Sequence, residues 1–155
     1  MRHISFALAL WVSTCFADGG VFYAHNNGVA QQIPAAQYVV VTLSTTKFDD
    51  GSHFHNSRWY PPAGPVSLAG QLFILDSGGI PVNPSYVAKV IKNGNADVCT
   101  GIGAAGSLWW TVVMQFACND KAEPGDYYEL WVLASSNTYC LLDGNPSHTF
   151  LSGRF

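Results

Sequence analysis

Short apolar and aromatic runs alternate with clusters of turn-forming residues along this chain. Within the runs, apolar side chains tend to occur at every second position, which is the period of a β-strand. No window combines helical periodicity with helix caps. The strands that the pattern predicts are Val21–His25, Tyr38–Phe48, Ser57–Tyr60, Val66–Asp76, Tyr86–Asn93, Ser107–Cys118, Tyr127–Ser135, Thr138–Leu142 and His148–Phe155. This spacing predicts an all-β sandwich or barrel.

The run from 127 to 133 predicts a strand that is apolar on both faces. One face carries Tyr128, Leu130 and Val132, which suit a sandwich core. The opposite face carries Tyr127, Glu129, Trp131 and Leu133. A large aromatic face with one charge is unusual for a solvated surface. We therefore expect these four residues to lie in an interface between subunits, and Trp131→Glu to yield monomer or aggregate.

Composition narrows the class of partner. The chain has 155 residues, of which 11% are charged and 14% aromatic, and its net charge is −3. It is too apolar for disorder and long enough to bury a core of its own. The absence of a basic footprint makes nucleic acid an improbable partner. Many aromatics with few charges also agree with coverage by another chain.

Residues 1–20 form a segment distinct from the domain at 21–155. A basic start is followed by an apolar stretch from Ile4 to Val12 and by small residues up to Ala17. This is the pattern of a secretory signal peptide cleaved after Ala17, and the alternative is an N-terminal arm that is retained. The stretch is too short to cross a membrane, so no membrane insertion is expected.

The four cysteines show no zinc-ligand spacing. Cys99 and Cys118 flank a glycine-rich stretch and could meet across it, but buried free thiols are the preferred interpretation. We expect Gly101, Gly103 and Gly106 to lie in a flexible hairpin loop, because they match neither a phosphate-binding loop nor a dinucleotide fingerprint.

The order of several motifs resembles one family. The run from Ile33 to Leu75 has a strand ending at an Asp-Gly turn, an aromatic strand, and a Pro-x-x-Gly leading into an apolar strand. These parts and the later matches are Phe48-Asp49, Phe54 to Tyr60, Pro61-Pro62-Ala63-Gly64, Lys92-Asn93-Gly94, the run from Gly125 to Val132, and the run from Thr149 to Phe155. Together they resemble the globular-head domain of complement first component subcomponent q, a relative of tumour necrosis factor, in its bacterial or bacteriophage form.

The resemblance implies a jelly-roll sandwich of about ten antiparallel strands that assembles as a three-fold homotrimer and has no enzymatic activity or cofactor. Phage domains of this kind are fibre, spike or capsid-decorating components, whereas cellular ones are secreted binding modules. Two features depart from the family. Arg154 stands where an aromatic or apolar residue is usual, and no Gly-X-Y repeat precedes the domain. The second argues against a complement-like pattern-recognition role.

Candidate chemistry is sparse. His53 and His55 lie two apart on an expected strand and hence on one face, a geometry that could bind a metal, but we interpret them as solvated histidines of a surface strand. Asp49, Asp50, Asp76, Asp143 and Asn145 are oxygen ligands in loops that could suit calcium, but turn formation is the preferred role. No catalytic nucleophile motif occurs. Adjacent Trp109 and Trp110 point to opposite faces if they lie in a strand, so at most one can bind a sugar.

Three hypotheses follow. The first is a trimeric virion-surface domain that contacts a host receptor, a host glycan or neighbouring virion proteins. The second is a secreted extracellular binding module with the same fold, which the signal-like start favours. The third is a small secreted carbohydrate-binding protein that uses exposed tryptophan or tyrosine.

Overall fold

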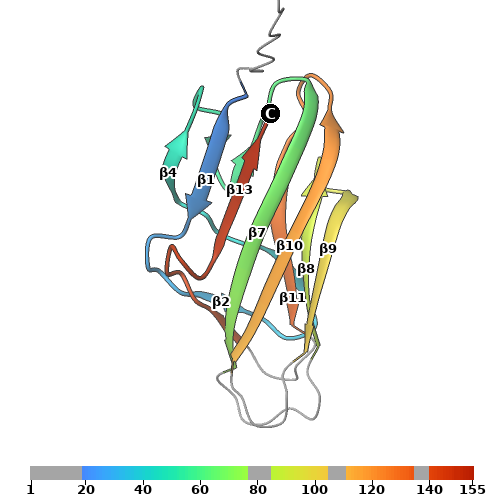
Figure 1. Cartoon of the computed structure of the whole chain (residues 1–155). Helices are drawn as coiled ribbons and strands as arrows, with labels where there is room; N and C mark the ends of the chain where they lie inside the picture. The colour runs from blue at the N-terminus through green and yellow to red at the C-terminus, as the bar shows by residue number, and fades with distance from the viewer. Residues whose placement is uncertain (1–18, 77–84, 105–110, 135–139) are drawn as a thin grey trace, which may run out of the picture.

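The computed structural model describes residues 19–76, 85–104, 111–134 and 140–155. In these ranges the chain forms strands in two antiparallel sheets, the all-β sandwich that the alternation predicts (Figure 1). The strands are β1 (Val21–His25), β2 (Gln31–Ile33), β3 (Tyr38–Val40), β4 (Thr45–Asp49), β5 (Phe54–His55), β6 (Arg58–Trp59), β7 (Gly64–Asp76), β8 (Ser85–Lys92), β9 (Ala96–Ala104), β10 (Thr111–Ala122), β11 (Tyr128–Ala134), β12 (Cys140–Leu142) and β13 (Phe150–Arg154).

One sheet is built around the long strand β7. β10 pairs with β7 along nearly its whole length. On the other edge of β7, β13 and β12 pair with successive parts of the strand, and the sheet continues from β13 through β1 to β4. β2 extends it beside β12. We call the surface of this sheet that faces away from the core the β7 face.

The second sheet is built around β11. β8 pairs along one edge of β11 and carries β9 on its far side. On the other edge, β6 pairs with the start of β11 and β3 with its end. We call the outward surface of this sheet the β11 face.

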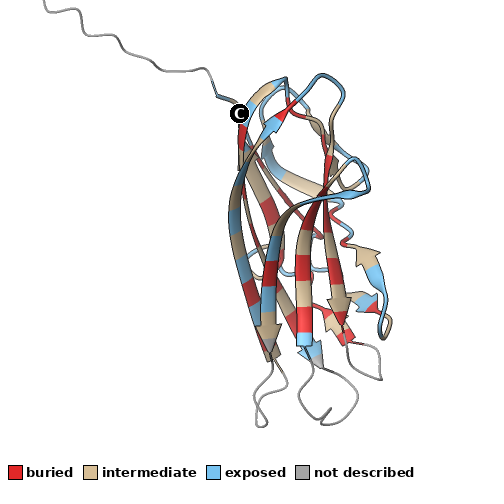
Figure 2. Cartoon of the chain, turned by 90° about the vertical axis from the view of Figure 1, so that its right-hand side faces the viewer, coloured by how far each residue is buried: buried red, intermediate tan, exposed pale blue. Residues whose placement is uncertain are grey.

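The core lies between the two sheets. Burial alternates along the strands, as the bands in Figure 2 show. Tyr128, Leu130 and Val132 have no exposed surface, as the alternation in this run predicts. Trp59 is also fully buried, and its ring packs 4.5 Å from that of Phe22. The inward residues of both sheets form a single cluster, so the described strands share one hydrophobic core.

Several predicted elements need correction. The strand expected at 38–48 is two strands, β3 and β4, that belong to different sheets. β2 and β5 were not expected, and β10 continues to Ala122 rather than ending at Cys118. Residues 107–110, 135 and 138–139, which were assigned to strands, lie outside the described residues, as do Trp109 and Trp110.

The largest error concerns β9. Gly101 and Gly103 lie in this strand rather than in a flexible loop, and Gly106 falls outside the described residues. A Cβ atom on Gly103 would lie 2.7 Å from side-chain carbons of both Val112 and Met114. Glycine is therefore needed because β9 packs closely against β10 across the sandwich.

The interpretation of Cys99 and Cys118 as free thiols is also wrong. Their sulfur atoms are bonded, and their Cα atoms lie 5.9 Å apart, within the usual range for a disulfide. The bond joins β9 of one sheet to β10 of the other. Cys140 is buried, and its thiol donates to the Tyr86 hydroxyl at 3.7 Å. Cys15 and the rest of the signal-like segment lie outside the described residues.

Turn chemistry agrees with the sequence at the β8–β9 hairpin. Asn93 and Gly94 both have positive φ values, 54° and 74°. The Asn95 amide closes the turn by donating to the carbonyl of Lys92. Two positive-φ residues give the turn the twist that joins antiparallel strands, which explains the Asn-Gly pair at this position.

Candidate functional site

The β7 face is organised in rows that run across five strands. Strand register places Phe48 beside Tyr23, then Ser152, Ala69 and Ala117. Aromatic residues therefore occupy the β4–β1 side of this row, and small residues occupy the β13–β7–β10 side. The flanking rows hold Val21, Arg154, Ser67 and Asn119 on one side, and His25, Phe150, Gln71 and Gln115 on the other.

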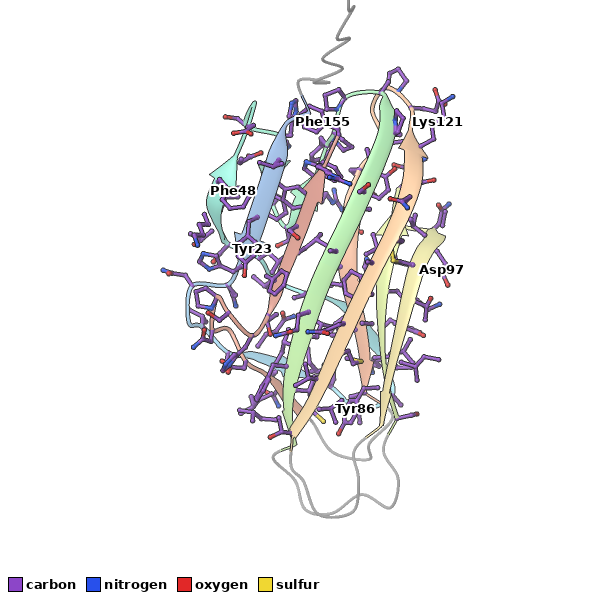
Figure 3. The ribbon with its side chains drawn as sticks, in the orientation of Figure 1. Tyr23, Phe48, Tyr86, Asp97, Lys121 and Phe155 are labelled. Carbon is purple, nitrogen blue, oxygen red and sulfur yellow. A yellow bond between two sulfur atoms is a disulfide. The ribbon has the colours of Figure 1, made fainter. Side chains whose placement is uncertain are left out.

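Three aromatic rings form a ridge on this face, which we call the aromatic ridge. The ring of Tyr23 stacks on that of Phe150 with centroids 4.8 Å apart, and lies 5.7 Å from that of Phe48. Figure 3 shows Tyr23 and Phe48 next to each other on β1 and β4. Phe48 is 42% exposed although it is a large apolar side chain.

The small residues beside the ridge form the floor of two hollows. The larger has a volume of about 570 Å³ and extends from Phe48 and Tyr23 across Ala69 to Ala117. The second, of about 420 Å³, continues along the floor toward Phe150. We call these adjoining hollows the alanine groove. A groove of this depth exists because small side chains occupy positions where neighbouring rows carry aromatic or amide groups.

The β7 face is nearly uncharged. Among the residues of its three rows, Arg154 is the only one with a formal charge. Polar side chains on this face form hydrogen bonds with one another. The Gln115 amide donates to the side-chain carbonyl of Gln71 at 2.6 Å, and the Ser67 hydroxyl donates to the side-chain carbonyl of Asn119 at 2.7 Å. Apart from Arg154, which also lines the larger hollow, such a face can be covered by another apolar surface at low desolvation cost.

The β11 face is different because it carries an ion pair between a buried carboxylate, Glu129, and a partly exposed guanidinium, Arg58. The Glu129 side chain is 4% exposed. Arg58 donates its Nε–H to Oε1 of Glu129 at 2.7 Å, and Trp131 donates its Nε1–H to Oε2 at 3.1 Å. The hydrogen bond to Glu129 raises the pKa of the Arg58 guanidinium above its ordinary value. The guanidinium also lies 4.5 Å from the ring centre of Tyr127.

The structure therefore brings three of the four predicted interface residues, Tyr127, Glu129 and Trp131, into one network on this face. Leu133 lies further along β11, between Tyr38 of β3 and Val87 of β8. Tyr127, Trp131 and Leu133 are each partly exposed in the single chain. Their place in an interface stays a prediction.

A third, smaller hollow lies beside Trp131. It has a volume of about 190 Å³ and is lined by Tyr38, Lys89, Ile91, Gly94, Asn95, Asp97 and Trp131. Lys89 forms an ion pair with Asp97. The hydrogen bond from Lys89 to Asp97 raises the pKa of the lysine. The Lys89 ammonium also lies 5.2 Å from the ring centre of Tyr38, so polar and aromatic groups share this hollow.

An ion-pair network fixes the end of the sandwich next to this hollow. Lys92 contacts Asp126 at 2.8 Å and Asp120 at 3.2 Å. The hydrogen bond from Lys92 is the main reason why the pKa of Asp126 falls to about 2. Asn93 adds a second hydrogen bond to Asp126, which connects the network to the turn of the β8–β9 hairpin.

The two histidines with metal-ligand spacing pack against different rings. His53 lies edge-on to Phe155, with centroids 5.2 Å apart, and His55 stacks on Tyr60 at 4.3 Å. His53 precedes strand β5, so the shared strand assumed from the sequence is wrong. Across the described ranges, no group of three or more His, Cys, Asp or Glu side chains is arranged to hold a metal ion.

Two of the carboxylates considered as calcium ligands, Asp49 and Asp143, hold turns, although Asp49 is the last residue of β4 and Asp76 the last of β7 rather than loop residues. Asp49 accepts hydrogen bonds from the backbone amides of His53 and Phe54. Asp143 accepts one from the amide of Asn145 and contacts the His148 ring at 2.6 Å. These contacts explain the aspartates as turn formers. The side chain of Asp76 lies outside the described residues.

Sequence reasoning missed the aromatic ridge and the alanine groove. The strand from Val21 to His25 has Val21 and Tyr23 on its outward side, so the test applied to residues 127–133 would also have flagged it. The groove left no such signal. Its floor comes from three strands far apart in the sequence, and only their register places the small residues together.

Comparison with known proteins identifies the fold. No protein-family model and no curated protein sequence matches the chain. Among the described residues, no helix is long and apolar enough to span a membrane. Solved structures do match. Murine APRIL at pH 5.0 is 14% identical, with a TM-score of 0.63 over 88% of this chain and 98% of that one.

Two other structures give the same picture. The Eiger TNF of S. frugiperda is 13% identical, with a TM-score of 0.58 over 88% of this chain and 90% of that one. The globular domain of the zebrafish complement 1qA protein is 11% identical, with a TM-score of 0.57 over 88% of this chain and 96% of that one. The chain therefore has the jelly-roll fold of the tumour necrosis factor and complement C1q globular domains.

Proposed function

We propose that this protein is a non-catalytic binding domain that assembles as a homotrimer through its β7 face. The observation that carries the proposal is the combination of the aromatic ridge and the alanine groove on one nearly uncharged surface. Interface cores are depleted of charge and enriched in aromatic residues, and the β7 face has both properties. Phe48 and Val21 are 42% and 39% exposed in the single chain and would be buried in such an interface.

The geometry also suits a ring of three. In a cyclic trimer each subunit presents one surface to the next copy and a different surface to the previous one. The ridge and the small-residue floor of the groove lie side by side on the same face, and Phe48 and Tyr23 of the ridge line one side of the larger hollow. The ridge of one copy can therefore occupy the groove of its neighbour, and the contact can repeat around a three-fold axis.

The β11 face is the second candidate for the interface. The sequence predicts it from Tyr127, Glu129, Trp131 and Leu133. The β7 face is the stronger candidate because contacts within the chain already bury the Glu129 carboxylate and hold Trp131 in place. An interface on the β11 face would have to desolvate both charges of the Lys89–Asp97 ion pair, whereas the three rows of the β7 face contain one charged residue, Arg154.

The experiment is a measurement of molar mass in solution by size exclusion with light scattering. The wild-type chain should have the mass of three subunits. Ala117→Arg places a charge in the alanine groove and should yield folded monomer. Ala96→Arg is the matched control, because Ala96 is equally an exposed strand alanine but lies on β9.

Trp131→Glu decides between the two faces. If it retains the trimer while Ala117→Arg loses it, the β7 face is the interface. If Trp131→Glu dissociates the trimer and Ala117→Arg does not, the β11 face takes its place. A wild-type chain that remains a single subunit at high concentration contradicts the assembly altogether.

Two settings for this domain are proposed. In the first it is a bacteriophage virion-surface component, such as a fibre, spike or capsid decoration, that contacts a host receptor or other virion proteins; the bacterial-type order of the motifs supports this. In the second it is a secreted extracellular module. The signal-like start of the chain supports the second setting. The Cys99–Cys118 disulfide agrees with both settings, because disulfides persist on virion surfaces as well as in secreted proteins.

N-terminal sequencing of the natural product separates the two settings. A mature chain that begins at Asp18 supports secretion. A chain that retains Met1 and is recovered in purified virions supports the first.

A further inference from the structure

We infer that the hollow beside Trp131 on the β11 face binds one neutral sugar residue of a glycan. The inference rests on the proposed function, in which self-association uses the β7 face and leaves the β11 face open. It adds a ligand class and a set of residues to the binding role.

The first requirement for a sugar site is an aromatic platform. A pyranose has an apolar face of C–H groups that packs on an aromatic ring, and its hydroxyls point outward at the edge. Trp131 and Tyr38 supply two rings that line this hollow, and Tyr38 is 41% exposed. Tryptophan and tyrosine rings combine a large apolar surface with one polar group, which suits contacts that are partly exposed to solvent.

The second requirement is that the platform is held still. The indole of Trp131 is fixed by its Nε1–H hydrogen bond to Glu129, and the ion pair with Arg58 fixes Glu129 in turn. The network uses the polar edge of the indole, and Trp131 also lines the hollow. A rigid platform lowers the entropy cost of binding.

The third requirement is a polar rim that can bond to hydroxyl groups. Lys89, Asn95 and Asp97 line the same hollow, and the Asp97 side chain is 50% exposed. Figure 3 shows Asp97 on β9, across the molecule from the aromatic ridge. Hydrogen bonds between a charged group and a hydroxyl are among the stronger ones. Both Lys89 and Asp97 can form a hydrogen bond with a sugar hydroxyl while the ion pair between them stays intact.

Charge selects the class of sugar. Lys89 is neutralised by Asp97, and Arg58 by Glu129. No cation at the hollow is left to favour a carboxylate or a sulfate. The site should therefore prefer neutral sugars to sialic or uronic acids.

Size and position complete the argument. A hollow of about 190 Å³ is smaller than the usual pocket for a drug-sized ligand, so it fits one ring rather than a long ligand. With so few atoms in contact, we expect an affinity on the order of millimolar for a monosaccharide. Three copies in one trimer would raise the apparent affinity for a glycan-coated surface through multivalency.

The test uses the full chain and a panel of methyl glycosides of glucose, galactose, mannose, N-acetylglucosamine, glucuronic acid and sialic acid. Binding is measured by saturation-transfer NMR and titration. We expect saturable binding of at least one neutral glycoside. Asp97→Ala should weaken it roughly tenfold or more through loss of a charged hydrogen bond. Trp131→Phe should weaken it as well, and Asn119→Ala on the β7 face is the control that should not.

Three results would overturn the inference. One is that no neutral glycoside binds at tens of millimolar. Another is that binding is unchanged in Asp97→Ala, which is expected to fold because this side chain is half exposed. The third is selective binding of acidic sugars that disappears in Lys89→Met. If this face binds a protein and not a glycan, no neutral glycoside should bind, which is the first of these results.

Failure of the sugar site can be told from failure of the assembly. The monomeric variant Ala117→Arg should bind the methyl glycoside as tightly as wild type and lose only the enhanced binding to a glycan-coated surface. If wild type is monomeric yet binds the glycoside, the assembly fails and the sugar site stands. If the trimer forms and no glycoside binds, the reverse holds.

Discussion

The two outward faces of this sandwich each expose an aromatic side chain to nearly the same degree, yet the groups around the two rings differ in charge. Phe48 on the β7 face is 42% exposed and Tyr38 on the β11 face is 41% exposed. Phe48 stands in an uncharged ridge beside a groove of small residues. Tyr38 stands beside an ion pair and a tryptophan held by hydrogen bonds. Exposure alone does not distinguish a subunit interface from a ligand site, so our proposals rest on the placement of charge around each aromatic ring.

Loss of the disulfide should have the largest effect, because Cys99 and Cys118 join the two sheets that carry these faces. The bond closes a segment with a sequence separation of 19, for which we expect a stabilisation of about 3 kcal/mol. A reductant should therefore lower the Tm of the wild-type domain by roughly 6–12 °C. The double variant Cys99→Ser, Cys118→Ser is the control, since its Tm should be low and insensitive to reductant. An unchanged wild-type Tm would contradict the role of the bond.

The matched pair Phe48→Ala and Tyr38→Ala compares the faces directly. Truncation of an aromatic side chain at an interface costs about 2 kcal/mol, so Phe48→Ala should raise the dissociation constant of each contact roughly 30-fold. Tyr38→Ala removes a side chain of similar size and exposure and should leave the trimer intact. Sedimentation equilibrium measures both constants. Equal effects of the two changes would mean that the distinction between the faces is wrong.

Glu129→Gln should have a smaller effect and sharpens the account of the β11 face. The amide retains a hydrogen bond from Trp131 but loses the charge that Arg58 contacts. We expect a loss of roughly 1 kcal/mol in the free energy of unfolding, measured by urea denaturation. A gain in stability would mean that burying the carboxylate costs more than its two partners return.

The smallest effect concerns acid. The hydrogen bond from Lys92 lowers the pKa of Asp126 to about 2, from an ordinary value of 3.8. Because the folded pKa is the lower one, this carboxylate stabilises the fold above about pH 4, and the contribution is lost as pH falls toward 2. Urea unfolding at pH 5 and pH 2 should show a smaller decline for Asp126→Asn than for wild type. An identical decline would exclude Asp126 as a source of the acid sensitivity.

The sequence predicts the sandwich and much of its core because alternation is a local property. The strand Val21–His25 has the predicted bounds, and Tyr128, Leu130 and Val132 are buried as expected. β9 could not be recognised, since Gly101 and Gly103 resemble loop residues until the close packing against β10 is known.

The candidate sites depend on contacts between distant segments. Nothing near Glu129 in the sequence shows that Arg58, 71 positions away, pairs with it. The sequence leaves a contact between Cys99 and Cys118 open but cannot establish it, because the two cysteines lie on strands of different sheets. The alanine groove exists only in the register of β13, β7 and β10, which no local pattern of Ser152, Ala69 or Ala117 reveals.

Hydroxyl-radical footprinting of the assembled protein tests the central claim most directly, because it reports which aromatic side chains remain accessible to solvent. At concentrations where the trimer forms, Tyr23 and Phe48 should become protected from oxidation relative to the Ala117→Arg monomer, while Tyr38 and Trp131 should react equally in both. Protection of Trp131 and Tyr38, with Tyr23 and Phe48 still reactive, would contradict the assignment of the β7 face to self-association and the β11 face to ligand.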